Sequence, residues 1–241
     1  MSLLLYCILR GRTGREHPCL TGVNGEKVLF VTAEGLCAAV SRVNPSELAL
    51  DAARILAYEK VVARLHREFT VIPMRYGCVL DGESRIARLL EERRGPYAAL
   101  LDELAGRVEM GVRVLSADRG CDPERRAVPR PHPNSPGRDY LAAQRSHYAR
   151  DERRAEAGRA FVKRVRAAFA GLFVKWKEES RTAGIGPFAL PAPLFSLYFL
   201  IPAESVEEFR KRFHELDTED GPGLLLTGPW APYSFVISDE A

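Results

Sequence analysis

The side chains best suited to hold a metal ion are those of Cys7, His17, Cys19 and Cys37. Structural zinc sites usually pair ligands two to four residues apart, and only His17 and Cys19 meet that spacing. Cys7 and Cys37 lie in apolar runs, where a reduced cysteine packs as a small hydrophobic side chain. We therefore predict no metal site.

The glycine-rich stretch GRTGRE, residues 11–16, follows an apolar run and raises the question of a phosphate-binding loop. It lacks the Gly-Lys-Ser/Thr ending of a P-loop, and no helical pattern follows it to supply backbone donors. The histidines do not stand in a hydrolase motif, since GxSxG and HExxH are both missing. We predict that the protein is not an enzyme and has no catalytic residues and no cofactor.

Positive charge is concentrated in one part of the chain. Residues 119–166 hold 13 Arg and Lys against 6 Asp and Glu, whereas the whole chain holds 35 against 32. A basic helix over residues 138–166 would bring these cations to the phosphates of a nucleic acid. A nucleic-acid-binding or regulatory module is therefore the alternative function, set against the simpler interpretation of a solvated helix face with acids mixed in.

The carboxy-terminal segment TGPWAPYSF, residues 227–235, is the least generic part of the sequence. Two prolines restrict the backbone on either side of Trp230, and Tyr233 and Phe235 follow in alternation. Trp230, Tyr233 and Phe235 are candidate partner-binding residues, because rigidly held aromatic side chains are common anchors of protein interfaces. The alternative is that Trp230 packs locally and pins the tail onto a sheet.

Arg75 is the fourth candidate partner-binding residue. It follows Pro73 at the end of an apolar strand, and Glu109 lies on the polar side of an alternating strand. Both positions suit an interface, and we expect a weak ion pair between the two side chains. Such a pair organises an interface more than it stabilises one.

Residues 1–106 contain the elements of an amino-terminal α+β domain. Strands are expected at residues 3–10, 27–34 and 36–43. A long helix begins near Ser46 or Asp51, either of which could cap it, and two shorter helices between residues 81 and 106 are separated by a Gly-Pro break. The apolar stripe of the long helix comprises Leu48, Ala52, Ile55, Tyr58, Val62, Leu65 and Phe69.

The sequence of residues 107–241 predicts a second, carboxy-terminal domain. Its expected elements are a strand at 107–116, a proline-rich loop at 117–137, a long basic helix from 139 to about 179, a strand at 194–201, a helix at 206–216 and extended segments at 224–229 and 233–237. This order is a split βαβ plan, the modified ferredoxin-like fold with extra helices. The fold class of the whole chain is therefore α+β with two domains.

Composition limits the class of protein further. The 241 residues are 46% hydrophobic, which is enough to build a core. The longest apolar run, residues 3–9, is far shorter than the roughly 20 residues of a membrane-spanning helix. It also makes a poor signal peptide, and the five cysteines form no CxxC pair. We expect a soluble intracellular protein with reduced thiols and no membrane contact.

Four segments together resemble the gas vesicle protein F/L family. They are TVIPMRYGCV at 70–79, GRVEMGVRV at 106–114, DYL at 139–141 and TGPWAPYSF at 227–235, and they occur in the family's order. The similarity covers nearly the whole chain. The chain departs from the family pattern at four places, where the family commonly has His, Phe, Thr and Pro instead of Tyr58, Tyr76, Cys78 and Ala231.

The resemblance implies a role as well as a fold. Members have two α+β domains, the second a modified ferredoxin-like fold, and no known catalytic residues. They are minor structural or assembly components of gas vesicles in the cytoplasm. Their expected partners are the major gas vesicle shell protein and other accessory proteins. Whether this chain is an F-type or an L-type member stays open.

Overall fold

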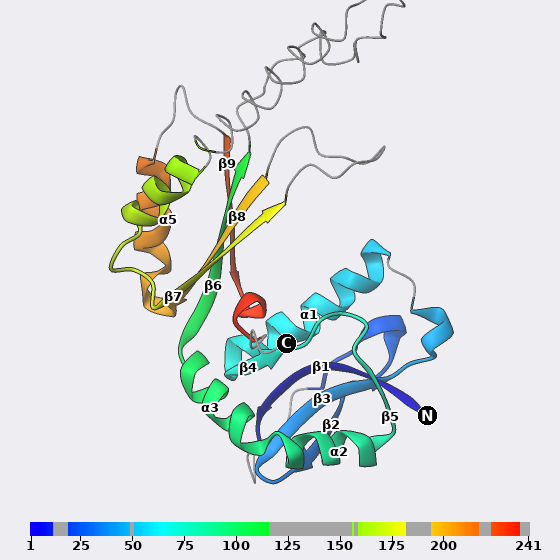
Figure 1. Ribbon diagram of the computed structural model, residues 1–241. Coiled ribbons are helices and arrows are strands. Elements are labelled where there is room, and N and C mark those ends of the chain that lie inside the picture. Colours follow the sequence, from blue (N-terminus) through cyan, green and yellow to red (C-terminus); the bar gives the residue numbers. More distant parts are fainter. Residues whose placement is uncertain are drawn as a thin grey trace, which may run out of the picture. The chain divides into compact units, whose positions relative to one another are not determined.

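The computed structural model describes residues 1–11, 19–48, 51–115, 156, 159–181, 194–216 and 223–236 (Figure 1). The chain divides into two compact units. The first comprises Met1–Glu109, Leu200–Ala203 and the residues from Gly228 onward, and the second comprises Met110–Phe199 and Glu204–Thr227. The proline-rich loop predicted at 117–137 and most of the predicted basic helix before residue 159 lie outside the described residues.

The first unit is built on an antiparallel sheet of short and long strands. Its strands are β1 (Ser2–Arg10), β2 (Leu29–Ala33), β3 (Leu36–Arg42), β4 (Val71–Pro73) and β5 (Val79–Asp81). Their order is β2-β3-β1-β4, and β5 also pairs with β1. The three strands predicted within the first 43 residues are confirmed, with ends shifted by one or two residues at most positions.

Both faces of β1 are buried, which explains its unbroken apolar sequence. Every residue from Leu3 to Leu9 is fully buried. The pairing register with β3 shifts between Leu5 and Cys7, so Leu4, Tyr6, Cys7 and Leu9 all enter the same core cluster despite their irregular spacing. A strand covered on both sides does not need the apolar–polar alternation of a half-exposed strand.

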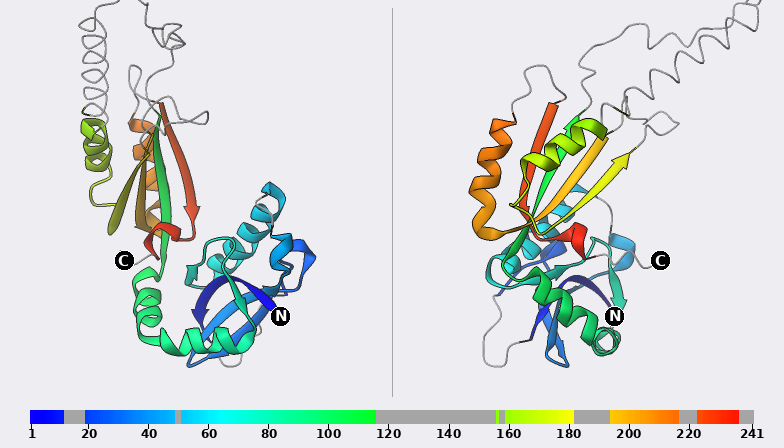
Figure 2. Two further views of the ribbon diagram at one scale, coloured as in Figure 1. Left: turned by 45° about the vertical axis from the view of Figure 1, so that its right-hand side comes forward. Right: turned by 60° about the vertical axis from the view of Figure 1, so that its left-hand side comes forward.

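Helices cover the two faces of this sheet. The chain forms α1 (Ala52–Glu68), α2 (Glu83–Glu92) and α3 (Arg94–Leu104), with short 3-10 turns η1 (Val23–Gly25) and η2 (Pro45–Glu47). α1 lies on one side of the sheet, and α2 and α3 lie on the other (Figures 1 and 2). The predicted helices are thus confirmed, including two helices where the sequence placed them between residues 81 and 106.

The buried stripe of α1 differs from the predicted one at its first turns. Asp51 is the N-cap, and its Oδ1 accepts a hydrogen bond of 2.9 Å from the backbone N–H of Arg54. The buried residues are Tyr58, Val61, Val62 and Leu65. Ala52 and Ile55 are exposed, because the first turns of the helix extend beyond the sheet that buries the later ones.

The second unit contains most of a second sheet. Its strands are β6 (Arg107–Leu115), β7 (Lys175–Arg181), β8 (Leu194–Pro202) and β9 (Gly223–Trp230), in the order β7-β8-β6-β9. Residues 159–168 are helical, and α5 (Val206–Glu215) follows the turn η4 (Ala203–Ser205). Phe169, Phe199 and Phe209 form an aromatic cluster in this unit, with the rings of Phe169 and Phe209 stacked at 3.9 Å.

The prediction of one helix reaching Glu179 is wrong. Helical residues end at 168, and a turn containing Gly171 at a φ of +84° leads into strand β7. Glycine adopts that left-handed conformation without the steric cost that other residues carry. The prediction of an extended segment at 233–237 is also wrong in its described part, since Tyr233–Phe235 forms the 3-10 turn η5.

Candidate partner-binding surface

The carboxy-terminal aromatic segment exposes Trp230, buries Phe235 and leaves Tyr233 partly buried. It runs from the end of β9 at Trp230 through η5 (Tyr233–Phe235), within the first unit (Figure 1). Trp230 leaves 49% of its surface exposed, whereas Phe235 leaves 7% and Ala231 leaves 5%. Ala231 belongs to the same core cluster as Tyr6 and Tyr58, so the segment is fixed to the core immediately beside the exposed tryptophan.

A buried carboxylate holds η5 in place. Glu109 is only 5% exposed. Its Oε2 accepts a hydrogen bond of 2.7 Å from the backbone N–H of Ser234, and its Oε1 accepts one of 3.0 Å from the Ser234 hydroxyl. Hydrogen bonds to a charged acceptor are stronger than neutral ones, and a buried carboxylate requires them. Glu109 therefore anchors the segment, although the sequence pattern placed it on a polar, exposed side.

Tyr233 is a second link between the segment and the first unit. Its hydroxyl oxygen is buried. Burial, and to a smaller extent the charge of Glu59 on α1, raises the pKa of Tyr233 well above its usual range. Burial also raises the pKa of Glu59, and the Tyr233 hydroxyl opposes that shift. The interaction between Tyr233 and Glu59 is electrostatic, because the Tyr233 hydroxyl has no partner with hydrogen-bond geometry among the described residues.

Tyr6 and Tyr58 belong to the core cluster that contains Ala231 and against which Tyr233 packs. The rings of Tyr6 and Tyr58 stack with their centroids 4.9 Å apart. The Tyr58 hydroxyl lies 2.7 Å from the carbonyl oxygen of Met74 and within 3.1 Å of those of Leu5 and Tyr6, so it always has an acceptor. Burial raises the pKa of Tyr58, which keeps the hydroxyl protonated as a donor.

The Tyr6 hydroxyl completes the polar part of this core. It accepts a hydrogen bond of 2.9 Å from the backbone N–H of Val23 and shares another of 2.9 Å with the Ser41 hydroxyl. Gly22 lies so close that an added Cβ would stand 2.1 Å from the Tyr6 oxygen. Helical periodicity places Tyr58 in the apolar stripe of α1 but does not predict the hydrogen bonds of either hydroxyl, because it indicates burial and not hydrogen bonding.

Arg75 is separate from these contacts. It is exposed in the turn between β4 and β5, where its carbonyl oxygen accepts a hydrogen bond of 3.2 Å from the backbone N–H of Cys78. The expected ion pair with Glu109 is not formed among the contacts of the described residues, since the Glu109 oxygens are bound by Ser234. The side chain of Arg75 is thus available on the surface and is not part of the aromatic segment's anchor.

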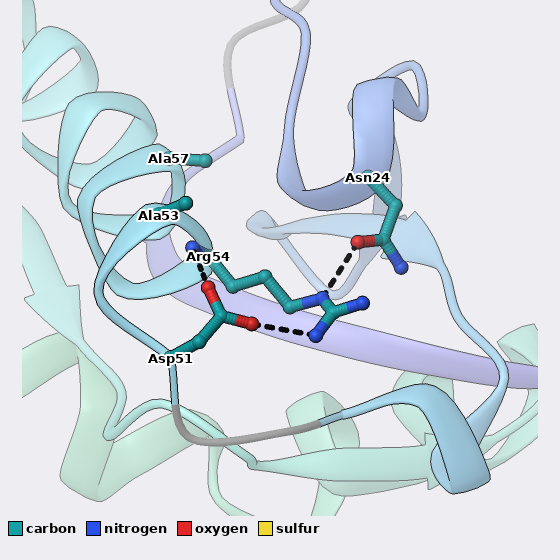
Figure 3. Close-up of a pocket in the computed structure, with 5 residues that line it drawn as sticks. All are labelled: Asn24, Asp51, Ala53, Arg54 and Ala57. Atoms are coloured by element: carbon teal, nitrogen blue, oxygen red, sulfur yellow. Dashed lines mark hydrogen bonds and ion pairs between the residues drawn. The ribbon is translucent and has the colours of Figure 1, made fainter.

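A shallow pocket at the start of α1 contains an arginine that is already neutralised. Asn24, Asp51, Ala53, Arg54 and Ala57 line it (Figure 3). The Arg54 guanidinium donates to Asp51 Oδ2 at 2.5 Å and to Asn24 Oδ1 at 2.9 Å. The hydrogen bond from the Arg54 backbone and the neighbouring guanidinium lower the pKa of Asp51. These contacts fasten η1 to α1, and we assign the pocket a structural role.

The described part of the chain shows no metal-binding group among the candidate zinc ligands. The described residues contain no group of three or more His, Cys, Asp and Glu side chains suited to a metal ion, and His17 lies outside them. Cys7 and Cys37 are buried and Cys19 is exposed. Burial raises the pKa values of the Cys7 and Cys37 thiols, which favours the protonated form that does not bind metals. Within the described residues, no helix is long and apolar enough to cross a membrane.

The fold and this surface define a mixed α/β protein with two sheets and an aromatic carboxy-terminal segment anchored beside an exposed tryptophan. The chain belongs to the GvpL/GvpF family of gas vesicle synthesis proteins, whose sequence model matches residues 2–237. The family description names gas vesicle synthesis and no catalysed reaction.

Individual relatives agree with this family. Over 201 residues the chain is 34% identical to gas vesicle protein L of Streptomyces sp. (strain CB03234), covering 79% of this chain and 71% of that protein. It is 26% identical over 250 residues to gas vesicle protein F of the same organism, covering 98% of this chain and 100% of that protein. The resemblance to gas vesicle proteins F and L inferred from the sequence is confirmed.

Two crystal structures share the fold. Gas vesicle protein GvpF from Anabaena sp. PCC7120 matches with a TM-score of 0.72 at 20% identity, covering 99% of both chains. GvpF from Microcystis aeruginosa matches with a TM-score of 0.73 at 17% identity, covering 98% of this chain and 99% of that chain. At these identities the matches speak for the fold alone.

Proposed function

We propose that this protein is a minor structural or assembly component of gas vesicles that binds the major gas vesicle shell protein. Family membership supports the gas vesicle role. We further propose that it acts without catalysis or a cofactor, resides with the gas vesicle in the cytoplasm, and works alongside other gas vesicle accessory proteins.

The exposure of Trp230 is the observation that supports a binding role most directly. A tryptophan that is 49% exposed is unusual for its size, and its neighbours Ala231 and Phe235 are buried. Because the backbone on its carboxy-terminal side is fixed, little conformational freedom is lost when the indole docks in a partner. Trp230 is therefore the proposed anchor, and Tyr233 and Phe235 position it. Arg75 is a proposed contact at the rim.

The test is co-purification of the tagged protein with the co-expressed major shell protein. Trp230→Ala should weaken retention by roughly thirtyfold or more, the usual effect of truncating an interface hot spot. Leu56→Ala is the matched control, because Leu56 is a 59% exposed apolar residue of the same unit on α1. Equal retention of the shell protein by Trp230→Ala and by the unchanged protein, with both folded, would reject Trp230 as the anchor.

We also propose the finer architecture expected from the sequence. Counted from β6, the second sheet has the strand order 4-1-3-2, and helical residues follow the first and third strands. This order supports a modified ferredoxin-like domain. The two compact units support two domains with a boundary near residue 106, with the segment from Gly228 packing with the amino-terminal residues.

A further inference from the structure

A groove in the second unit is lined by cations on one side and by an aromatic ring on the other. The helical residues 159–168 lie beside the sheet that contains β7 (Figure 2). Between the helix and the strand is a groove, here called the basic groove, lined by Arg159, Val162, Lys163, Arg166, Trp176 and Glu178. With three cations and one carboxylate, its lining carries a net positive charge.

The cations of the basic groove can be compared with the ion-paired arginines on the other described helices. Four arginines elsewhere pair with a carboxylate three or four residues away on or beside their own helix: Arg54 with Asp51, Arg64 with Glu68, Arg210 with Glu207, and Arg212 with Glu208. Arg159, Lys163 and Arg166 make no ion pair with any described carboxylate. Among the described residues, the positive charge of the groove is therefore not neutralised by an ion pair, and it could attract an acidic ligand.

The spacing of these cations suits a helical ligand. Arg159, Lys163 and Arg166 follow steps of four and three residues, so they form a row along one side of the helix. Val162 is 4% exposed and forms an apolar part of the groove lining. Acidic side chains at the same steps on a second helix would meet the row, and an apolar side chain between them would contact Val162.

The aromatic side of the groove disfavours a nucleic acid. Single-stranded nucleic acids bind by stacking bases on exposed aromatic rings. The guanidinium of Arg166 already covers the Trp176 ring at 4.7 Å from its centroid. A carboxylate-bearing peptide needs no stacking platform and bonds an arginine in a planar, two-point geometry.

We propose that the basic groove binds an acidic amphipathic helix of a partner protein. The cation row binds the carboxylates of that helix, and Val162 contacts its apolar side. The inference stands on the second unit alone and does not depend on the proposed contact of Trp230 with the shell protein, which lies in the first unit. A failure of either proposal therefore leaves the other intact.

The experiment measures the anisotropy of a labelled helical peptide with Glu at positions i, i+4 and i+7 and Leu between them. Lys163→Glu should weaken binding by roughly five- to thirtyfold, because one attraction becomes a repulsion. Arg164→Glu is the matched control on the same helix. Arg164 lies over the Phe161 ring at 4.5 Å and does not line the groove, so its reversal should change affinity by less than about threefold.

Two further measurements locate the peptide and identify its class. The chain has 2 tryptophans, so Trp230→Phe leaves Trp176 as the only indole, and its emission should change as the peptide saturates. A peptide with Gln in place of Glu should not bind. Equal weakening by the Lys163 and Arg164 reversals, tighter binding of a single-stranded oligonucleotide than of the peptide, or no peptide binding would each overturn the proposal.

Discussion

At the scale of single residues, buried polar side chains restrict how the core of the first unit can pack, in addition to its apolar residues. The hydroxyls of Tyr6 and Tyr58 and the carboxylate of Glu109 all lie in the interior with hydrogen-bond partners. A buried polar group without a partner is costly, so each of these side chains restricts the packing to the arrangement that satisfies it. Their partners are backbone groups and the hydroxyls of Ser41 and Ser234, which lie far away in the sequence.

His66 on α1, like the Tyr233 hydroxyl, is buried without a hydrogen-bond partner among the described residues, and it predicts a dependence of stability on pH. Both ring nitrogens are buried and have no hydrogen-bond partner among the described residues, and burial lowers the pKa of His66. The folded state therefore prefers the neutral ring. Below the unfolded pKa of about 6.5 the unfolded chain binds the proton more readily, so the free energy of unfolding should fall as pH drops through this range.

Glu59 contributes to the pH dependence of stability with the opposite sign, so its effect must be distinguished from that of His66. Its raised pKa means that it stabilises the fold at low pH and that this contribution is lost as pH rises through its folded pKa. Urea unfolding across mildly acidic pH should be compared for the unchanged chain and His66→Leu. The free energy of unfolding of the variant should fall less on acidification than that of the unchanged chain. Identical pH profiles would contradict this prediction and show that His66 is accessible to protons in the folded state.

At the scale of elements, the turn between the helical residues 159–168 and β7 shows how one glycine ends a helix. Gly171 has a φ of +84° and an added Cβ would meet nothing within 4 Å, so only its backbone conformation opposes a side chain. Gly95 in α3 is also open to a Cβ but does not have a positive φ. The two positions therefore differ in whether a side chain would have to adopt a left-handed backbone conformation.

Alanine at these two glycines should change stability by different amounts. Gly171→Ala should lower the free energy of unfolding by about 1–2 kcal/mol, the cost of a left-handed conformation for an L-residue. Gly95→Ala should change it by less than about 1 kcal/mol, because alanine favours the helix whereas the following Pro96 disfavours a helical backbone for a residue with a Cβ. Urea unfolding measures both. A loss of stability at Gly95 as large as at Gly171 would contradict the conformational explanation.

At the scale of the whole molecule, the two ends of the sequence belong to one compact unit. The segment from Gly228 packs with residues 1–109, and Ser234 meets Glu109 across a separation of 125 residues. The first unit is therefore incomplete until the last part of the chain is present. This arrangement ties the position of Trp230 to the amino-terminal core and not to local sequence alone.

Removing the segment should destabilise the first unit. A chain ending at Gly228 loses the buried Phe235 and Ala231 and both hydrogen bonds to Glu109, so we expect a loss of roughly 3–6 kcal/mol. Hydrogen exchange of amides in β1 and α1 reports on this unit. A chain ending at Val236, which keeps all of these contacts, is the control and should behave like the full chain. Unchanged exchange in the shorter chain would contradict this account.

The amino-acid sequence by itself determined whether a segment is a helix or a strand wherever a short local pattern is enough to distinguish them. The apolar run of β1, the three- and four-residue steps of α1 and the alternation in β6 each specify backbone structure within a short window. The segments around TGPWAPYSF also determined the family, which the comparisons confirmed. The prediction of a helix reaching Glu179 was wrong because the three- and four-residue apolar steps continue past Gly171 to Leu172 and Trp176, although Trp176 already belongs to strand β7.

Only the tertiary structure decided which polar residues are buried and which aromatic one is exposed. Glu109 occupies a position in β6 that alternation assigns to solvent, and it is buried because η5 folds over it and supplies two donors. Trp230, Tyr233 and Phe235 are equivalent in the sequence pattern, yet the fold covers Phe235 and leaves Trp230 open. Local periodicity reports the neighbours of a residue along the chain, whereas burial depends on contacts made by residues far away in sequence.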